Sequence, residues 1–587
     1  MKFFQSGMAL AAFAAVASAQ KQQSYDYVIV GGGTAGSALA TRLSQGLPNA
    51  SILLVEAGPS ALEDLRINVP GMRGAILGSE LDWNFTTVAQ TSLEGRSIGV
   101  NRGKVLGGSS AMNYLCYNRA SAPEYEAWAE LGNEGWGWDA MKGGMTRSEN
   151  FTGVDNDLHG RDGPIRNLYN RVSYPVIDMW TETSANAGFL VTERSSMGGD
   201  NIGMTFQPTN IHNEKKTRSY SANSYLPLAG PNLEVVTSTQ VEKVNLVGCK
   251  AGRFRASGIT LPGGKVIKAA REVILSAGAV QSPGLLELSG VGQPEVLKAA
   301  GVTPLVDLPG VGENYQDHIR VSNTYELKDD VDSFDNLIFD NQGKNATGEL
   351  QKWLSGERSL YEFTSKAYGF LTWEQLGVAD KMKAAAAASA KDHVVDKKKL
   401  EYLGNSRVPS VEYILDPNYV GAFGYKGGKY VTIFSTVMHP MSRGSVHIDP
   451  KDPKGKPTID PKYLDNQYDV QGLIEGAKTA RKLAATEPLA SALKAETEPG
   501  PAVQTEEQWA DFVRKAANSF FHPSGTVAML PRKDGGVVDA DLRVYGTTNL
   551  RVVDNSVIPI VPSAHIQTTA YGIAEVAAAR IIAAAKR

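Results

Sequence analysis

The stretch YDYVIVGGGTAGSALATRLSQGLPNASILLVEAGP, residues 25–59, decides the fold of this chain. Residues 27–30 form a short apolar, β-branched run that is typical of a buried strand. Residues 38–43 are expected to be helical, and residues 51–55 form a second buried strand. This order of strand, glycine turn, helix and strand predicts a βαβ unit that binds a dinucleotide.

The glycines and the acid of this stretch each have a physical role. Gly31 permits the tight turn, Gly33 lets the backbone approach a pyrophosphate, and Gly36 lets helix and strand pack closely. The helix N-terminus supplies free N–H donors for the phosphates. Glu56 follows twenty residues after Gly36, where a carboxylate accepts hydrogen bonds from ribose hydroxyls and disfavours NADP. These residues leave the cofactor open between NAD and FAD.

Length and composition indicate a large globular protein of at least two domains. The 587 residues are too many for one ordinary core. Hydrophobic residues make up 42% and charged residues 21%, as in globular proteins. The formal net charge of −3 gives no electrostatic case for binding nucleic acid or an anionic membrane. We expect neither partner.

The N-terminus, MKFFQSGMALAAFAAVASAQ, predicts a signal peptide at residues 1–19, with cleavage before Gln20. Its apolar run is too short for a membrane anchor. The sequons at Asn84, Asn150 and Asn345 then predict a secreted or secretory-pathway glycoprotein.

Two cysteines, Cys116 and Cys249, are too few for a cysteine-rich zinc or iron–sulfur site. No metal site is expected. The sequence leaves open whether these two cysteines form a disulfide, because it does not reveal the distance between them.

Residues 101–119, NRGKVLGGSSAMNYLCYNR, contain a glycine turn at 107–110. The apolar residues that follow have helical spacing: Ala111, Met112, Leu115 and Cys116. A glycine turn that opens a helix can hold a second polar edge of a cofactor. Taken alone, a purely structural turn is the simpler interpretation.

Residues 321–508 predict a second domain. Strands at 430–438 and 444–448, with a helix at 469–486, indicate an antiparallel sheet flanked by helices. Alanine and lysine at 381–399 favour helix, and the lysines there are expected to be a solvated face.

Together these motifs resemble those of the glucose–methanol–choline (GMC) oxidoreductases, a family of FAD enzymes. The resemblance covers nearly the whole chain from residue 25. It rests on residues 101–119, GAVQSPGLLELSGVG (278–292), LPGVGENYQDH (308–318), HPSGT (522–526) and VVDNSVIP…SAHIQTT (552–569). Signal peptide and sequons make the chain similar to secreted fungal members such as aryl-alcohol oxidases and glucose oxidases.

The resemblance implies FAD rather than NAD and an α/β fold, α+β overall, with two domains. A Rossmann-like FAD-binding domain would be assembled from discontinuous segments, residues 20–147, 229–320 and 515–587. A substrate domain, residues 148–228 and 321–514, would hold a large antiparallel sheet flanked by helices.

The resemblance also implies which residues contact FAD. They are Gly31, Gly33, Thr34, Ala35, Gly36, Glu56, Ala57, Trp83, Arg102, Val105, Gly108, Asn113, Tyr114, Leu115, Cys116, Val241, Asp554, Asn555, Gln567 and Thr568. Some family members tether FAD through a histidine four residues before the lysine of the first signature. That position is Val100 here, so we expect FAD to be bound without a covalent link.

The chemistry implied is the oxidation of an alcohol by hydride transfer to the flavin. The catalytic residues are expected to be His522, as the base that takes the hydroxyl proton, and His565, as the partner that orients the hydroxyl. A neutral imidazole suits the first task because its pKa lies near physiological pH. Electrons would pass to O₂ or to another acceptor.

Two alternatives keep the FAD and change the reaction. One is a lyase or cyclase of secondary metabolism in which FAD is structural and the histidines act as acid and base. The other, a photodecarboxylase, is disfavoured because that chemistry does not need the histidine pair. The sequence leaves open the alcohol, the electron acceptor and whether the protein is a monomer or a homodimer.

Overall fold

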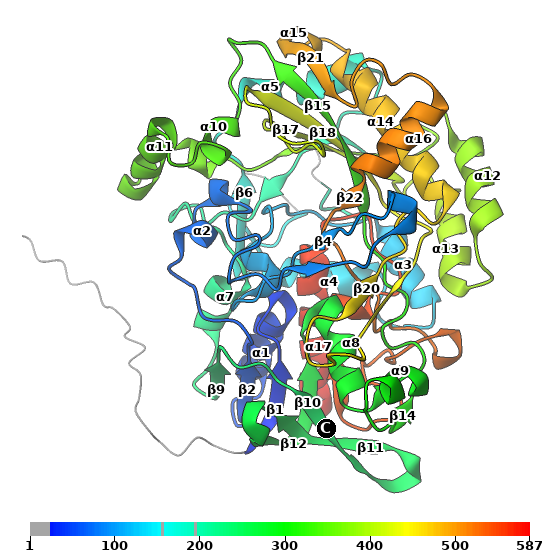
Figure 1. Ribbon diagram of the computed structural model, residues 1–587. Helices are drawn as coiled ribbons and strands as arrows, with labels where there is room; N and C mark the ends of the chain where they lie inside the picture. The colour runs from blue at the N-terminus through cyan, green and yellow to red at the C-terminus, as the bar shows by residue number, and fades with distance from the viewer. Residues whose placement is uncertain (1–23, 154–157, 193–195) are drawn as a thin grey trace, which may run out of the picture.

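The computed structural model describes residues 24–153, 158–192 and 196–587. Two large sheets organise these residues, one in the lower and one in the upper half of Figure 1. The predicted signal peptide at 1–19 lies outside the described residues. Along the described residues, none of the helices combines the length and the apolar character needed to cross a bilayer.

The lower sheet has a parallel core typical of dinucleotide-binding folds. Its parallel strands are, in spatial order, β9 (Leu233–Val236), β2 (Ile52–Val55), β1 (Ser24–Val30), β12 (Val266–Leu275) and β23 (Leu550–Val552). The strands β10 (Lys243–Gly248) and β11 (Phe254–Thr260) extend this sheet in antiparallel pairing. Strands from distant parts of the chain therefore form one sheet, as expected of a discontinuous domain.

Helices packed against one another cover a face of this sheet. Helix α17 (Gln567–Ala585) packs between α1 (Thr34–Gly46) and α4 (Trp138–Ser148). Because helices and loops cover both faces of a parallel sheet, its strands read as continuous apolar runs. Residues 52–55 are all buried for this reason.

The predicted βαβ unit is present. The expected strands lie within β1 and β2, and α1 begins at Thr34, four residues before the predicted helix start. Gly31 has φ 103°, a left-handed conformation that favours glycine. A Cβ on Gly36 would lie 1.9 Å from the carbonyl oxygen of Gly31, so only glycine lets α1 approach the turn this closely.

The upper sheet is antiparallel. Its order is β21 (Leu493–Glu498), β15 (Ile319–Leu327), β18 (Tyr430–Val437), β17 (Val411–Asp416), β16 (Ala367–Leu371) and β7 (Gly203–Phe206), with β22 (Asn518–Ser519) also paired to β15. Helix α14 (Gln467–Ala484) packs on β15 and β18 and is itself covered by α12 (Ala379–Ser389) and α16 (Glu506–Ala516). The sheet and helices predicted for the second domain are thus present.

Alternation along the strands decides which side chains face the lower half of the molecule. Val437 contacts α14, since a Cβ on Gly472 would lie 2.9 Å from it. Side chains of opposite parity point the other way. Tyr368, Ile414 and Phe434 are cross-strand partners on that second face, where they form a buried apolar cluster. This face becomes one wall of the candidate active site.

Three local predictions require correction or refinement. The helix expected after the glycine turn does not form, because only the 3₁₀ helix η3 (Gly108–Ala111) follows, and Leu115 has φ 63°. The strand predicted at 444–448 exists as β19 (Ser445–His447), but it pairs with β20 (Thr458–Asp460) outside the large sheet. Both cysteines are free thiols, Cys116 buried and Cys249 exposed.

The lysine run is not a uniformly solvated face. Lys399, on α13 (Val394–Tyr402), is only 1% exposed and donates a hydrogen bond of 2.6 Å to the carbonyl of Pro440. Burial lowers the pKa of Lys399 to about 7. The expected domain boundaries stay predictions, although β7 and β15 lie in the upper sheet and β9 to β12 in the lower.

Candidate active site

A cavity of about 1300 Å³, open solvent at its mouth included, lies at the carboxyl ends of the parallel strands. Its wall includes Val30 and Val55, the last residues of β1 and β2, and Ser276, which directly follows β12. This is where open α/β sheets bind nucleotides. Twelve of the expected cofactor contacts line it: Gly31, Gly33, Thr34, Ala35, Glu56, Ala57, Trp83, Arg102, Gly108, Val241, Asp554 and Asn555.

The N-terminus of α1 opens into this cavity and suits a diphosphate. Its N-cap residue, Gly33, has no side chain, and no hydrogen bond from a described side chain caps the helix. The first N–H groups of an α-helix have no partner within the helix. Gly108 lies opposite, with its Cα 3.7 Å from the position of a Cβ on Gly33. Bare backbone therefore lines both sides of an anion-binding position.

Glu56 both supports the glycine turn and faces the cavity. Its two carboxylate oxygens accept hydrogen bonds of 2.8 Å from the backbone N–H groups of Gly32 and Gly58. Burial raises the pKa of Glu56 to about 7, and the two backbone donors oppose that shift. A carboxylate can accept about four hydrogen bonds, so lone pairs remain for ribose hydroxyls.

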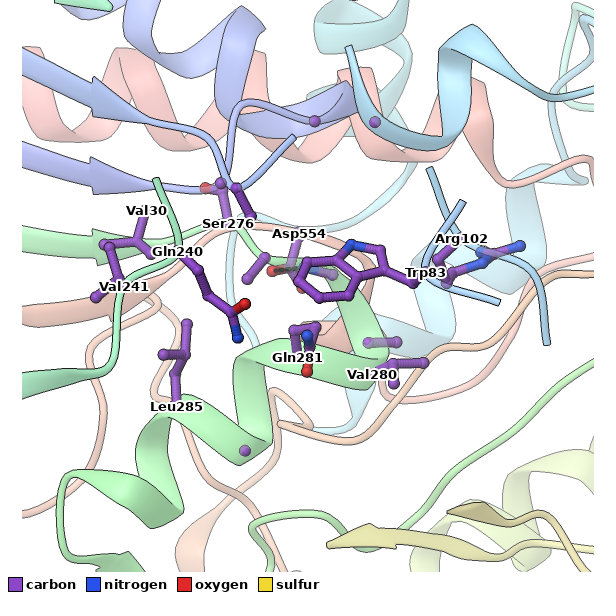
Figure 2. Close-up of a pocket in the computed structure, with 18 of the residues that line it drawn as sticks. Val30, Trp83, Arg102, Gln240, Val241, Ser276, Val280, Gln281, Leu285 and Asp554 are labelled. Atoms are coloured by element: carbon purple, nitrogen blue, oxygen red, sulfur yellow. Dashed lines mark hydrogen bonds between the residues drawn. The ribbon is translucent and has the colours of Figure 1, made fainter. Parts of the chain in front are cut away.

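The cavity runs from an apolar end to an aromatic end. Figure 2 shows Val241, Gln240 and Leu285 at one end and Trp83 and Arg102 at the other. Trp83 stacks on Phe85, with ring centres 5.6 Å apart. Sequence reasoning missed Gln240, Ser276, Val280, Gln281 and Leu285, although three of them belong to the 278–292 motif, which was the available signal.

Asp554 ties the middle of the cavity to α8 (Gly278–Leu288). It accepts hydrogen bonds from the hydroxyl of Ser282, at 2.6 Å, and from the N–H of Gly278, at 2.9 Å. Among the described residues, the Oγ of Ser276 and the Oδ1 of Asn555 are buried without a hydrogen-bond partner. Unpartnered buried polar atoms in a cavity wall fit a polar ligand such as FAD.

A second cavity of about 1140 Å³ adjoins the first. Both are lined by Thr34, Arg102, Ser109, Asn555 and Ala570, so they meet at these residues. The second cavity contains both predicted catalytic histidines and four more expected cofactor contacts: His522, His565, Asn113, Tyr114, Cys116 and Gln567. The apolar cluster of the upper sheet forms its opposite wall. The predicted catalytic histidines therefore lie in the cavity next to the expected cofactor site.

Four predicted contact residues lie behind the walls. Gly36 packs α1 on the glycine turn, and Val105 is fully buried in an apolar cluster. Leu115 packs with other buried apolar side chains, and the hydroxyl of Thr568 donates to the carbonyl of Asn118. None of the four lines either cavity, so they support the site from behind its walls.

His522 is held in a defined tautomer by His318, whose role the sequence reasoning missed. The Nε2 of His318 lies 3.0 Å from the carbonyl oxygen of Met438, which can only accept, so this nitrogen carries the hydrogen. The Nδ1 atoms of His318 and His522 are 2.8 Å apart. Since the Nδ1 of neutral His318 is an acceptor, the Nδ1 of His522 donates. The Nε2 of His522 therefore keeps a free lone pair.

Burial, with added repulsion from His565, His318 and Arg102, holds the pKa of His522 well below its usual range. Burial likewise lowers the pKa of His318. His522 is therefore a neutral imidazole at physiological pH, the form that can accept a proton.

His565 has the opposite charge preference. Burial alone would lower its pKa, but the sulfur of Cys116 and the carboxylate of Glu412 together raise that pKa well above its usual range. The Nε2 of His565 lies 3.0 Å from Glu412. His565 is therefore an imidazolium, which donates hydrogen bonds, and its ring centre lies 4.9 Å from that of His522. The two histidines have environments that separate a base from a donor.

Asp317 fixes the loop that carries His522. Its carboxylate accepts hydrogen bonds from the backbone N–H of His522 at 2.7 Å, the hydroxyl of Ser519 at 2.6 Å and the hydroxyl of Tyr463 at 2.5 Å. Asp317 and His318 are the last two residues of the 308–318 motif, and the sequence analysis assigned a role to neither. Within the described part of the chain, no cluster of three His, Cys, Asp or Glu side chains could hold a metal ion.

Comparison with known proteins agrees with this geometry. Family models described as GMC oxidoreductase match residues 25–320 and 440–574. A GMC oxidoreductase family protein of Malassezia sympodialis is 36% identical over 585 residues, which cover 95% of this chain and 92% of the relative. Pyranose dehydrogenase 3 of Leucoagaricus meleagris is 32% identical, with 94% and 92% covered.

Solved structures match over nearly the whole chain. A fungal aryl-alcohol oxidase superposes with a TM-score of 0.84 at 27% identity, covering 96% of this chain and 100% of that one. An FAD-dependent oxidoreductase from Chaetomium thermophilum superposes with a TM-score of 0.86 at 26% identity and the same coverage.

Proposed function

This chain belongs to the GMC oxidoreductase family, and we propose that it oxidises an alcohol to a carbonyl compound with FAD as its cofactor and His522 as its base. The observation that carries the proposal is the pair His522 and His565, with ring centres 4.9 Å apart, in a cavity that shares wall residues with the dinucleotide cavity. Relatives named pyranose dehydrogenase and aryl-alcohol oxidase support a substrate with a CH–OH group.

The residues that would hold FAD are those of the first cavity and its junction with the second. The N-terminus of α1 would bind the diphosphate, and Glu56 would accept from the ribose. Near the histidines, the Nδ2 of Asn113 donates to the Oε1 of Gln567 at 2.8 Å, so these amides would present a fixed polar edge to the ring. Bound FAD supplies the hydride acceptor, its N5 atom.

The two histidines would divide the work on the substrate hydroxyl. The free Nε2 lone pair of His522 takes the hydroxyl proton as the hydride leaves the adjacent carbon. Because the Nε2 of His565 is engaged with Glu412, its Nδ1–H would donate a hydrogen bond to the same oxygen and so fix its position. The apolar wall of Tyr368, Ile414 and Phe434 excludes water from the reacting atoms. The proposed electron acceptor is O₂ or another small molecule.

The experiment is anaerobic mixing of the FAD-loaded protein with a panel of primary and secondary alcohols. Loss of the yellow flavin absorbance with at least one alcohol, and formation of the matching carbonyl compound, is the expected result. A flavin that no alcohol bleaches, together with an alcohol-independent elimination or cyclisation, would instead support a lyase or cyclase.

We also propose that the FAD is not covalently linked. Val100 is fully buried, pairs with Phe85 in the sheet of β3 (Phe85–Thr86) and β4 (Gly99–Val100), and lines neither cavity. Its side chain has no nucleophilic atom. Acid precipitation should release the yellow cofactor into the supernatant, and colour kept by the protein pellet would contradict this.

Secretion and N-glycosylation are likewise proposed. Asn84 and Asn345 are exposed, and Asn150 is half-buried in β5 (Glu149–Phe151). Protein purified from the native source should begin near Gln20 and lose mass on treatment with an N-glycosidase. An intact N-terminus without glycans would contradict the proposal.

A further inference from the structure

Besides Arg102, a second arginine lines the cavity that contains His522 and His565. Arg320 lies on β15 and lines the second cavity beside the apolar wall. Its guanidinium carbon is 4.8 Å from the ring centre of Phe434 and 5.9 Å from that of Phe520. One of its nitrogens, Nη1, donates a hydrogen bond of 2.6 Å to the hydroxyl of Ser322. The two rings and this bond hold the guanidinium in one orientation.

Arg320 has no carboxylate partner. Among residues 24–153, 158–192 and 196–587, no Asp or Glu side chain forms an ion pair with it. Its Nε and Nη2 atoms make no hydrogen bond within the described protein, and neither is among the fully buried polar atoms that lack a partner. These donors are therefore open to the cavity. A buried or partly buried cation without a partner is unfavourable, so a ligand group is the expected complement.

The acids near the cavity are already engaged with other cations. Asp416 lies 2.7 Å from the guanidinium of Arg73, and Glu412 lies 3.0 Å from His565. Burial lowers the pKa of Arg320 to about 10, which leaves it charged at neutral pH. The substrate side of the cavity thus carries a positive charge that the described side chains do not neutralise.

Arg102, the other arginine of this cavity, belongs to the cofactor side. It lines both cavities where they meet, and the negative charges of Asp317 and Asp82 act on it. Its Nη2 donates to the carbonyl of Phe521 at 2.7 Å. Arg320 lines only the second cavity, on the wall formed by the upper sheet. Its open donors are therefore available to a substrate and not to the diphosphate.

We propose that Arg320 binds a carboxylate of the substrate, so that the substrates of this enzyme are alcohols that carry a carboxylate at the far end from the hydroxyl. This inference rests on the proposed alcohol oxidation. A planar guanidinium with two free donors matches a carboxylate in geometry as well as charge. In the reaction the hydroxyl proton goes to His522 and the hydride to FAD, while the carboxylate is unchanged.

The geometry also indicates the spacing between the two groups of the substrate. The ring of Phe520 neighbours both Arg320 and the histidines. Its centre is 5.9 Å from the guanidinium carbon of Arg320, 5.4 Å from the ring centre of His522 and 5.3 Å from that of His565, so the guanidinium lies within about 11 Å of both histidine rings. A substrate of about one aromatic ring with a polar group at each end fits within that limit, against the apolar ring of Phe520. A hydroxymethylbenzoate has this shape and chemistry.

Binding tests the proposal without turnover. The FAD-loaded protein is titrated with 4-methylbenzoate, which has no hydroxyl to oxidise, and with the uncharged 4-methylbenzamide, and changes in flavin absorbance and heat are followed. A hydrogen-bonded ion pair predicts that the acid binds about 10- to 100-fold more tightly than the amide. Arg320→Gln should abolish that preference, and Arg320→Lys should retain part of it. Equal affinity of the wild-type protein for acid and amide would overturn the proposal.

Turnover separates this inference from the function on which it rests. In anaerobic flavin reduction, Arg320→Gln should lose about 10- to 100-fold more kcat/KM with 4-(hydroxymethyl)benzoate than with 4-methylbenzyl alcohol. Equal losses on both alcohols would mean a structural role and overturn the proposal. If neither alcohol reduces the flavin while the acid still binds through Arg320, the alcohol oxidation fails and the carboxylate site stands. Flavin content and the thermal midpoint check folding, and if Arg320→Gln does not fold, the wild-type binding comparison decides.

Discussion

Replacing His318 should slow the reaction by changing the tautomer of His522, although His318 need not touch the substrate. The Nδ1 of His318 accepts the hydrogen of the Nδ1 of His522 across 2.8 Å, which leaves the Nε2 of His522 free to act as the base. In His318→Phe, this acceptor is replaced by a ring carbon. A buried N–H without a partner costs about 1–3 kcal/mol. The tautomer with a free Nε2 becomes less favourable by that amount, so the ratio of the two tautomers shifts about 5- to 150-fold against the base, and the rate should fall by up to that factor.

The assay is anaerobic stopped-flow reduction of the flavin at saturating alcohol. The rate for His318→Phe should fall in the range just given, while His318→Asn, whose carbonyl can accept the same hydrogen, should recover most of the loss. Flavin content and the thermal midpoint should report a folded protein in both variants. A wild-type rate in His318→Phe, or an equal loss in His318→Asn, would refute the tautomer argument.

Three further predictions follow from the charges of the site. Glu56→Ala should weaken FAD binding, because it removes a ribose acceptor and leaves two backbone N–H groups unpaired. Glu56→Gln should also bind FAD less tightly than the wild-type protein. Full flavin occupancy of Glu56→Ala at limiting FAD would show that this carboxylate is dispensable. The rate of flavin reduction should stay constant between about pH 5.5 and 7.5, the range in which an unperturbed histidine titrates. The reason is that the lowered pKa of His522 keeps its imidazole neutral throughout this range. A rate that falls as the pH is lowered through about 6.5 would contradict this. The ion pair of His565 with Glu412 raises the pKa of His565, so it stabilises the fold fully below about pH 6.5 and progressively less as pH rises through that raised pKa. The difference in thermal midpoint between wild type and Glu412→Gln should therefore shrink with rising pH. A difference that widens would count against the ion pair.

Local signals made the first part of the fold predictable. The strand, glycine turn, helix and strand of residues 25–59 are specified by neighbouring residues, and the structure matches them within a few positions. The same holds for β18 and α14, whose apolar patterns are long enough to identify the element type. The expected helix after the glycine turn failed because tertiary contacts override local spacing. Leu115 takes a left-handed backbone conformation, and Cys116 pairs with Thr209.

The charges of the site could not be predicted because they arise from contacts between distant segments. His318 and His522 are 204 residues apart in the chain, and Glu412 and His565 are 153 apart. No local pattern marks such pairs. Lys399 is a similar case, because a lysine within a charged run is normally solvated, whereas this one is buried against the carbonyl of Pro440 and near the carboxylates of Asp396 and Asp469.

The central claim is that His522 is the base, and the rate of flavin reduction by His522→Ala tests it most directly. The FAD-loaded variant is mixed anaerobically with an alcohol that bleaches the wild-type protein. General-base catalysis is worth about 100- to 10,000-fold, so the variant should stay folded and yellow while its reduction slows by at least that range. His565→Ala should also slow reduction, and the double variant should lose less than the product of the two effects, because both residues act on one hydroxyl. Reduction of His522→Ala at a rate near that of the wild-type protein would contradict the claim and leave His565 as the candidate base.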